Sequence, residues 1–264
     1  MDGAAATEPD HRTCRRLIRV ETSVSLLCLP CAGASATMYL RWRRLLPHWI
    51  RIVPVELPGR GSRSAESLVR DFDSLVAQIC AEHSEPMRGN FAIFGHSMGA
   101  LLAYGIACRL REMGRALPMA LLASGTSAPG RRDPARFAGK TDDASLIADL
   151  RKQGGTPEEV FASAELMRIT LDVLGADYRV CEGFRHSAEA PLPMPLHVFA
   201  GRDDDIEAER IRAWSAEAGG VFTLDWFDGG HFFIRQQETA FLAALSQRLG
   251  QVVAGDRHAA HVLA

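Results

Sequence analysis

Short apolar segments alternate with amphipathic segments along most of this chain. The apolar segments have the length of strands, and six strands are predicted: Val24–Leu29, Ile52–Leu57, Phe91–Phe94, Pro118–Ala123, Leu196–Ala200 and Phe222–Phe227. The amphipathic segments carry apolar residues at helical spacing on one side and predict helices over Met38–Trp49, Leu68–His83, Leu101–Glu112, Ala208–Ala218 and Glu238–Leu249. Because strands alternate with helices, the sequence predicts an α/β fold with a mostly parallel sheet between two layers of helices.

A long segment separates the fourth predicted strand from the fifth. About 70 residues lie between them, far more than an ordinary connection between a strand and a helix uses. Within this segment, Ala144–Lys152 and Glu165–Phe184 have the pattern of helices. We therefore expect a single domain over residues 1–264, with a helical insertion at about 129–192. We interpret the insertion as a lid over the serine described below, and a merely structural excursion is the alternative.

Composition and charge exclude several classes of protein. The chain has 264 residues, of which 47% are hydrophobic, enough for one large core. Residues 1–19 lack the apolar core of a secretion signal, and no run of about 18 apolar residues occurs, so we expect a cytoplasmic protein that does not span a membrane. The net charge of −2 argues against nucleic-acid binding. We expect free thiols and no metal site, and flexible ends at residues 1–15 and 252–264.

The segment with the clearest chemistry is a pentapeptide between a predicted strand and a predicted helix. Residues 95–99 read Gly-His-Ser-Met-Gly, and the strand Phe91–Phe94 ends directly before them. In a nucleophile elbow, a serine on a tight turn from strand to helix has its hydroxyl exposed above the sheet, and the flanking glycines give the backbone room. We therefore predict Ser97 as a nucleophile at the positive end of a helix.

A serine nucleophile needs an imidazole base and a carboxylate that orients the imidazole. With an elbow of this kind, the order along the chain is serine, acid, histidine. Of the histidines after Ser97, we predict His231 as the base because it lies in a loop directly after a predicted strand. Three carboxylates, Asp203, Asp204 and Asp205, follow the preceding strand. We favour Asp204 as the acid, while Asp203 and Asp205 remain alternatives whose other role is capping the next helix.

Two backbone N–H groups must stabilise the oxyanion that forms during acyl transfer. The residue after the nucleophile supplies one of them, which is Met98 here. The loop after the first predicted strand should supply the other, and we predict Ala32 in the turn at residues 29–35. Cys31 lies in the same turn, but no partner is specified by its spacing and a reactive thiol would duplicate Ser97. We do not favour Cys31 as a nucleophile.

Four motifs together indicate a family. They are Leu-Pro-Cys-Ala-Gly-Ala-Ser at 29–35, Glu-Leu-Pro-Gly-Arg-Gly-Ser-Arg at 56–63, Gly-His-Ser-Met-Gly-Ala at 95–100, and Gly-Arg-Asp-Asp at 201–204 with Gly-His-Phe-Phe at 230–233. With them, the chain resembles the stand-alone type II thioesterases of polyketide and nonribosomal peptide synthesis, in the α/β-hydrolase superfamily. The resemblance runs from about Leu26 to Leu249. Cys31 departs from the larger residue that members usually carry there.

This resemblance implies a function. Ser97, Asp204 and His231 would form the catalytic triad, and the N–H groups of Ala32 and Met98 the oxyanion hole. Members of the family hydrolyse acyl thioesters on the phosphopantetheine arm of acyl or peptidyl carrier proteins and clear stalled or misprimed chains, without metal or cofactor. We expect a monomer. A small-molecule esterase or acyltransferase of the same fold is the alternative, and a catalytically silent binding module is a remote one.

The family motif at residues 56–63 leaves one role open. Its basic part, Arg60 to Arg63, either contacts the phosphate of the carrier protein or forms a plain structural turn before the next helix.

Overall fold

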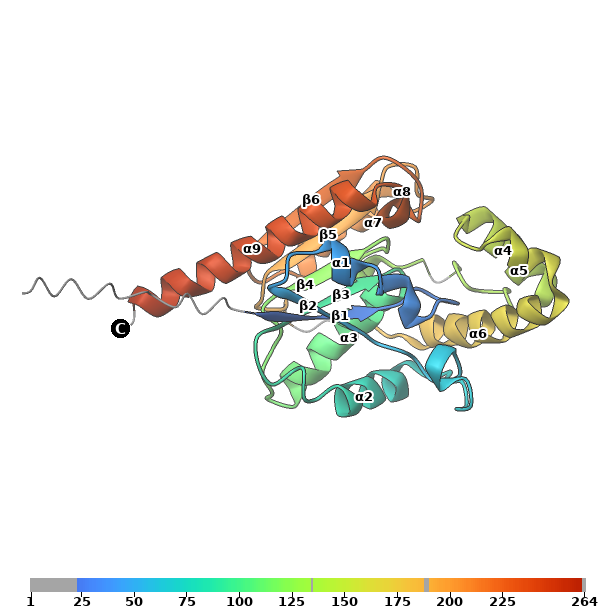
Figure 1. Cartoon of the computed structure of the whole chain (residues 1–264), viewed down its shortest axis with the longest axis horizontal. Coiled ribbons are helices and arrows are strands. Elements are labelled where there is room, and N and C mark those ends of the chain that lie inside the picture. Colours follow the sequence, from blue (N-terminus) through green and yellow to red (C-terminus); the bar gives the residue numbers. More distant parts are fainter. Residues whose placement is uncertain (1–22, 134, 188–189, 263–264) are drawn as a thin grey trace, which may run out of the picture.

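A six-stranded parallel sheet forms the centre of the computed structural model, which describes residues 23–133, 135–187 and 190–262 (Figure 1). The strand order is β2-β1-β3-β4-β5-β6, and every neighbouring pair is parallel. The strands are β1 (Val24–Leu29), β2 (Ile50–Pro54), β3 (Phe91–His96), β4 (Leu121–Ser124), β5 (Leu196–Gly201) and β6 (Phe222–Phe227). All six predicted strands are therefore confirmed, β1 and β6 with the predicted ends and the other four with shifted ends. The strand β2 ends earlier than predicted, at Pro54, where its pairing with Cys28 of β1 ends.

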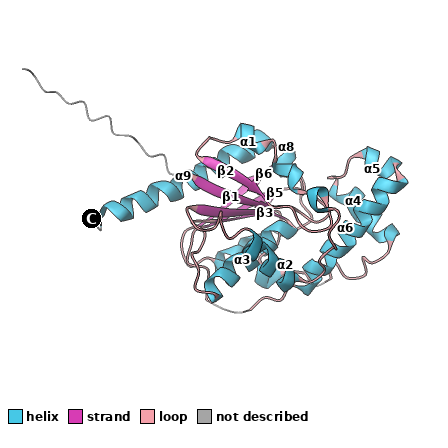
Figure 2. Ribbon diagram, turned by 60° about the horizontal axis from the view of Figure 1, so that its bottom comes forward, coloured by secondary structure: helices cyan, strands magenta, loops and turns pink. Residues whose placement is uncertain are grey.

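Helices cover both faces of the sheet, as the sequence predicts (Figure 2). On one face of the sheet lie α2 (Phe72–Glu82), α3 (Met98–Glu112) and α7 (Ala208–Arg212). They pack on alternate strand residues such as Leu27 and Ile93. On the opposite face of the sheet lie α1 (Trp42–Leu45), α8 (Phe233–Gln236) and α9 (Glu238–Val262). They pack on the intervening strand residues, such as Leu26 and Phe94. The sheet is buried on both sides, which explains why its strands read as continuous apolar runs.

The predicted helix Met38–Trp49 is wrong as a single element. The segment contains a short 3-10 helix, η1 (Ala36–Tyr39), followed by the short helix α1. The helix α1 ends because Leu46, which precedes Pro47, has an extended backbone with φ −88° and ψ 153°. A residue before proline is disfavoured in helical conformation, because the proline ring crowds its backbone and Cβ.

The other predicted helices are present but differ from their predicted bounds, and two of them differ most. The segment predicted at Ala208–Ala218 divides into α7 and a 3-10 helix, η4 (Ala213–Glu217). The last helix, α9, continues to Val262, past residue 252 where we expect a flexible end to begin. The other expected flexible end, residues 1–15, lies outside the described residues. No helix in the described ranges is long and apolar enough to cross a membrane.

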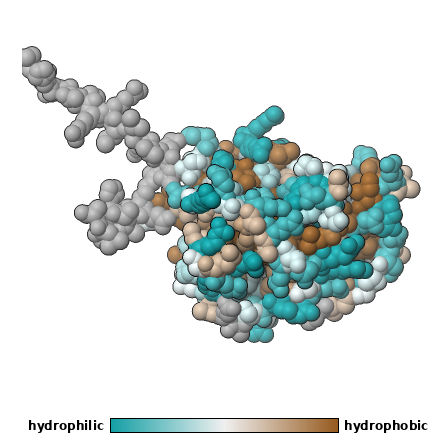
Figure 3. All heavy atoms as spheres, turned by 90° about the horizontal axis from the view of Figure 1, so that it is seen from below, coloured by the Kyte–Doolittle hydropathy of each residue, from teal (hydrophilic) through white to brown (hydrophobic). Residues whose placement is uncertain are grey.

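The insertion lies at one end of the molecule, at the right of Figure 1. After the 3-10 helix η3 (Pro129–Arg131) it contains α4 (Asp143–Gln153), α5 (Glu158–Ala162) and α6 (Ala164–Gly183), of which α5 is not predicted. A small core of its own includes Leu146, Leu171 and Leu174. Figure 3 shows apolar side chains at this end of a mostly hydrophilic face. Leu166 and Ile169 of α6 are exposed.

Candidate active site

The candidate site lies where the order of the strands reverses. The chain passes from β1 outward to β2 and then returns to β3 on the other side of β1, so the loops after β1 and β3 diverge at the carboxyl edge of the sheet. Crevices at such switch points are the usual ligand sites of open α/β sheets. Ser97 directly follows β3, and residues 30–35 directly follow β1. The fold therefore brings the predicted nucleophile and the predicted oxyanion loop to the same crevice.

Ser97 has the backbone of a nucleophile elbow. Its φ of 56° and ψ of −117° make it the one non-glycine residue with positive φ in the described part of the chain. Such a conformation costs free energy and persists only where the surroundings enforce it. A Cβ on Gly95 would lie 2.0 Å from the carbonyl oxygen of Gly99, and a Cβ on Gly99 would lie 2.1 Å from that of Leu29. The two glycines are therefore required for the close approach of β1, β3 and α3.

His231 and Asp204 form a close buried pair. The Nδ1 atom of His231 lies 2.8 Å from Oδ2 of Asp204, and the two side chains are 8% and 1% exposed. His231 lies in the turn after β6, and Asp204 lies in the loop after β5. A Cβ on Gly201 would lie 2.5 Å from the carbonyl oxygen of Gly230, so a glycine at the end of β5 lets the two loops meet. With Nδ1 as donor to the carboxylate, Nε2 of His231 is left to accept a proton.

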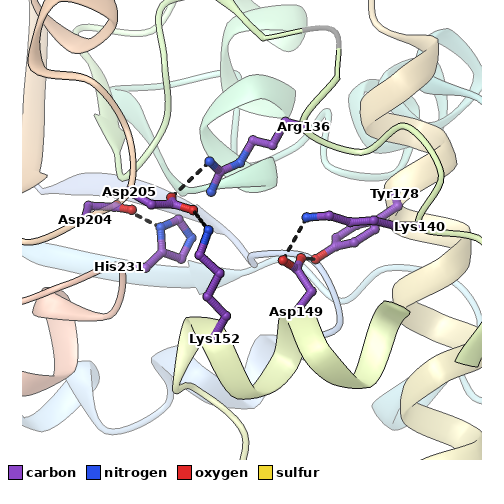
Figure 4. A network of polar contacts seen from close by, with 8 residues as sticks. All are labelled: Arg136, Lys140, Asp149, Lys152, Tyr178, Asp204, Asp205 and His231. Atoms are coloured by element: carbon purple, nitrogen blue, oxygen red, sulfur yellow. Dashed lines mark hydrogen bonds and ion pairs between the residues drawn. The ribbon is translucent and has the colours of Figure 1, made fainter. Parts of the chain in front are cut away.

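The three neighbouring aspartates make different contacts. Asp204 contacts His231, while Oδ2 of Asp203 accepts a hydrogen bond from the N–H of Gly229. Asp205 instead forms ion pairs with Arg136 and Lys152 of the insertion (Figure 4). Among the three carboxylates that the sequence leaves open, the geometry therefore favours Asp204 as the partner of the imidazole.

A second histidine lies beside His231. His96, within the elbow, is fully buried; its Nδ1 lies 3.0 Å from Oγ of Ser124, and its ring centroid is 5.0 Å from that of His231. Burial, and next the charge of His231, hold the pKa of His96 well below its usual range. His96 therefore stays neutral at physiological pH and packs against the histidine that would carry the proton. No role for His96 is predicted from the sequence.

One cavity of about 310 Å³ connects these groups. Ser97, Met98 and His231 line it from the side of the sheet, Ala32 lines it from the loop after β1, and the insertion supplies the facing wall. In the described ranges, the backbone N–H groups of Ala32 and Met98 donate to no backbone or side-chain acceptor. Both predicted oxyanion donors are therefore available to a ligand.

Part of the facing wall is polar. Asp149 and Tyr178 line the cavity, and the hydroxyl of Tyr178 donates a hydrogen bond to the buried carboxylate of Asp149. The Nζ atom of Lys140 lies 2.7 Å from the other oxygen of that carboxylate (Figure 4). Burial, together with the hydrogen bond to Asp149, raises the pKa of Tyr178, so its hydroxyl stays protonated. This cluster joins α4 to α6 behind the cavity.

The structure assigns no nucleophilic role to Cys31. Burial raises the pKa of its thiol to about 11, although the residue borders the cavity. Cys28 and Cys31 have the C-x-x-C spacing of many redox and metal motifs, and this spacing argues against the expectation that they are ordinary free thiols. Both are free thiols in the structure. No group of three or more His, Cys, Asp or Glu suited to hold a metal ion occurs among the residues that the structure describes.

Arg60 and Arg63 are both held by carboxylates. Arg60 is 6% exposed and pairs with Asp177, whereas Arg63 pairs with Glu66 and Glu82. Of the two roles that the sequence leaves open for this segment, the structure therefore favours the structural one.

Comparisons with known proteins show the family of the chain. A family model described as a thioesterase domain matches residues 24–249, most of the chain. The chain belongs to the thioesterase family. The thioesterase is 38% identical to the type II thioesterase BorB of the borrelidin biosynthetic cluster, with 86% of this chain and 93% of that chain covered and a TM-score of 0.77. The predicted α/β-hydrolase fold and thioester hydrolase activity are confirmed, and the resemblance to type II thioesterases with them.

Two curated relatives show similar identity over most of their lengths. The thioesterase PikA5 of Streptomyces venezuelae is 33% identical, over 82% of this chain and 77% of its own. A protein of Brevibacillus parabrevis named linear gramicidin dehydrogenase LgrE is 32% identical, over 90% of this chain and 92% of its own. The first relative is named as a thioesterase, and the name of the second refers to linear gramicidin.

Proposed function

We propose that this thioesterase is a serine hydrolase that removes acyl groups from the phosphopantetheine thiol of acyl or peptidyl carrier proteins, and so clears stalled or misprimed chains during polyketide or nonribosomal peptide synthesis. The observation that carries the proposal is that Ser97 and His231, the latter held by Asp204, line one cavity. The similarity to a type II thioesterase of a biosynthetic cluster supports the substrate class.

The first half of the reaction forms an acyl-enzyme. Nε2 of His231 takes the proton of the Ser97 hydroxyl as Oγ attacks the thioester carbonyl carbon, and Asp204 stabilises the imidazolium that results. The N–H groups of Ala32 and Met98 donate hydrogen bonds to the oxyanion of the tetrahedral intermediate. When this intermediate collapses, the carbon–sulfur bond breaks and the pantetheine thiol leaves with the proton from His231.

The second half releases the acid. A water molecule gives a proton to His231 and attacks the acyl-Ser97 ester, and collapse of the second intermediate restores the serine hydroxyl. Since the insertion supplies one wall of the cavity, we propose that it serves as the lid that selects the acyl group and limits the entry of water. The proposed reaction needs no cofactor. We propose a monomer that acts in the cytoplasm on its carrier-protein partner.

Other reaction classes have less support. A small-molecule esterase or acyltransferase would use the same residues and differs only in its acyl donor, so kinetics must separate it from the proposal. A dehydrogenase, as in the name of LgrE, would need a nicotinamide or flavin site. The turn after β1 has Gly33 as its one glycine, not the three-glycine turn that binds a dinucleotide. A silent binding module would have no use for the strained backbone of Ser97.

The test compares carrier-bound thioesters with a matched oxygen ester of the same short acyl group, for the wild type and for Ser97→Ala. We expect faster turnover of the acyl-carrier thioester, and a loss of at least about a thousandfold in Ser97→Ala with an unchanged melting temperature. Retained hydrolysis in Ser97→Ala would overturn the assignment of the nucleophile. A preference of the wild type for the free oxygen ester would replace the carrier protein with a small-molecule substrate.

A further inference from the structure

A buried ion pair connects the insertion to the body of the protein next to the proposed oxyanion hole. Arg60 lies in the loop after β2, and Asp177 lies on α6. Their side chains are 6% and 0% exposed. Nη1 and Nη2 of Arg60 each lie 2.6 Å from one oxygen of Asp177, which is the parallel two-point geometry of the strongest arginine–carboxylate contacts.

The same pair holds the loop after β1. The backbone N–H of Gly33 donates a hydrogen bond of 2.8 Å to Oδ2 of Asp177, and Nη1 of Arg60 donates one of 3.3 Å to the carbonyl oxygen of Ala34. Gly33 has a φ of 76°, and a Cβ there would lie 3.3 Å from Cδ1 of Leu174, one turn before Asp177 on α6. The backbone on the carboxyl side of Ala32 is therefore fixed by one residue from each of two distant segments.

This arrangement bears on the direction of the Ala32 N–H, because that group belongs to the peptide between Cys31 and Ala32, which joins the next peptide at the Cα atom of Ala32. The peptide between Ala32 and Gly33 is planar, so the hydrogen bond from Gly33 to Asp177 sets the orientation of the whole unit that follows Ala32. Donors act on an oxyanion only when they are held in place before the reaction. A loop released from Asp177 could turn the Ala32 N–H away from the cavity, although neither Arg60 nor Asp177 lines that cavity.

We propose that Arg60 and Asp177 are positioning residues that hold the Ala32 N–H in the oxyanion hole, so that the insertion is part of the catalytic apparatus and not merely a cover. This inference rests on the proposed function. It also gives the arginine at position 60 a role that differs from phosphate binding, because its guanidinium is turned inward to Asp177 and Ala34.

The test uses paired substitutions, because removal of one partner leaves a buried unpaired charge and threatens the fold. Arg60→Met with Asp177→Leu removes both charges and the acceptor for the Gly33 N–H. Arg60→Gln with Asp177→Asn also removes both charges but keeps an amide oxygen as that acceptor. Arg168→Ala is the matched control, since it breaks exposed ion pairs with Asp143 and Asp172 on the same insertion.

Three quantities are measured for each variant: kcat and KM on a short acyl group loaded on holo carrier protein, and the inhibition constant of butylboronic acid. The boronic acid adds to Ser97 as a tetrahedral anion and so reports on the oxyanion donors. We expect the Met/Leu variant to lose at least about tenfold in kcat and to bind the boronic acid at least about tenfold more weakly, with KM within about threefold of the wild type. The Gln/Asn variant should keep most of its kcat and of its affinity for the boronic acid, and Arg168→Ala should leave kcat, KM and boronic acid binding unchanged.

Three outcomes would overturn the inference. The first is a folded Met/Leu variant with kcat and boronic acid binding within about threefold of the wild type. The second is an equal loss in the Gln/Asn variant, which would show that Asp177 does not act through Gly33. The third is a loss of kcat without weaker boronic acid binding, which would show that the pair does not act through the oxyanion hole.

If neither pair folds, the same measurements are made on Arg60→Lys, which keeps the buried charge and Asp177 but loses the two-point contact and the hydrogen bond to Ala34. We then expect kcat to fall and boronic acid binding to weaken together, by about threefold or more, and unchanged values would overturn the positioning role of Arg60. Failure of the proposed function is distinct, because it appears in the wild type and in Ser97→Ala.

Discussion

Asp205 holds Lys152 of the insertion at the edge of the proposed triad, with 2.6 Å between its Oδ2 atom and Nζ of Lys152. Arg136 lies 3.0 Å from the other carboxylate oxygen (Figure 4). Burial raises the pKa of Asp205, but hydrogen bonds and charges from Lys152 and Arg136 outweigh it and hold the pKa well below its usual range. Because Asp204 is the residue directly before Asp205, these ion pairs tie the insertion to the loop that holds His231.

Asp205→Asn should therefore loosen the insertion without unfolding the protein. The ion pairs are partly exposed, so each contributes less than about 1 kcal/mol, and we expect backbone amides near the end of α4 to exchange about twofold to fivefold faster. Hydrogen exchange read by mass spectrometry measures this. Salt at about 1 M should give a similar acceleration in the wild type. Asp203→Asn is the control, since Asp203 bonds to Gly229, and equal exchange in both variants would contradict the prediction.

The choice of triad acid is tested by comparing the three aspartates. Asp204→Asn should lower kcat by about ten-thousandfold, because the amide can donate to Nδ1 of His231 and would favour the wrong tautomer. Asp203→Asn and Asp205→Asn should stay within about tenfold of the wild type. Steady-state hydrolysis of a short acyl thioester measures all three, and thermal unfolding checks the fold. A large loss confined to Asp205→Asn would move the acid by one residue.

Cys31 should be chemically quiet. With a pKa of about 11, only about one thousandth of its thiol is ionised at pH 8. Treatment with iodoacetamide at pH 8 should leave hydrolysis intact over the time in which glutathione is fully alkylated, and Cys31→Ala should keep kcat within about threefold. Rapid inactivation of the wild type that Cys31→Ala prevents would show a reactive thiol at the cavity wall.

The sequence predicts the sheet and the reactive loops well because those features are local. Buried parallel strands are continuous apolar runs, and the elbow around Ser97 needs its glycines at fixed spacing. The helix predicted from Met38 fails for a local reason too, since the effect of Pro47 on Leu46 is readable in the sequence. The choice among Asp203, Asp204 and Asp205 is different. It depends on how a turn folds back beneath His231, which spacing alone does not determine.

The contact between Arg60 and Asp177 shows a second limit. The two residues are 117 positions apart, and nothing in the segment around either one indicates the other as its partner. Only the packing of α6 against the loops after β1 and β2 buries them together. A motif that is strong in the sequence, such as the one around Arg60, thus indicates that a residue matters without showing whether it contacts a ligand or the fold.

His197 makes the stability of the fold dependent on pH. It lies in β5, is 1% exposed, and has its Nδ1 atom 2.8 Å from Oγ1 of Thr223 in β6. Burial, and next the charge of Arg248, lower its pKa from 6.5 to about 4. The unfolded chain therefore binds more protons than the folded chain between pH 6.5 and pH 4, and the free energy of unfolding must fall as the pH falls through this window.

Urea unfolding of the wild type and of His197→Gln measures this contribution. A shift from 6.5 to about 4 corresponds to a loss of about 2 kcal/mol in the free energy of unfolding between pH 7.5 and pH 5. His197→Gln has no group that titrates there, so its stability should fall by about that much less over the same range. His96 is also buried and also has a lowered pKa, but it is present in both proteins, so its contribution cancels in the comparison. Parallel pH profiles for the two would mean that His197 is protonated in the fold as readily as in the unfolded chain.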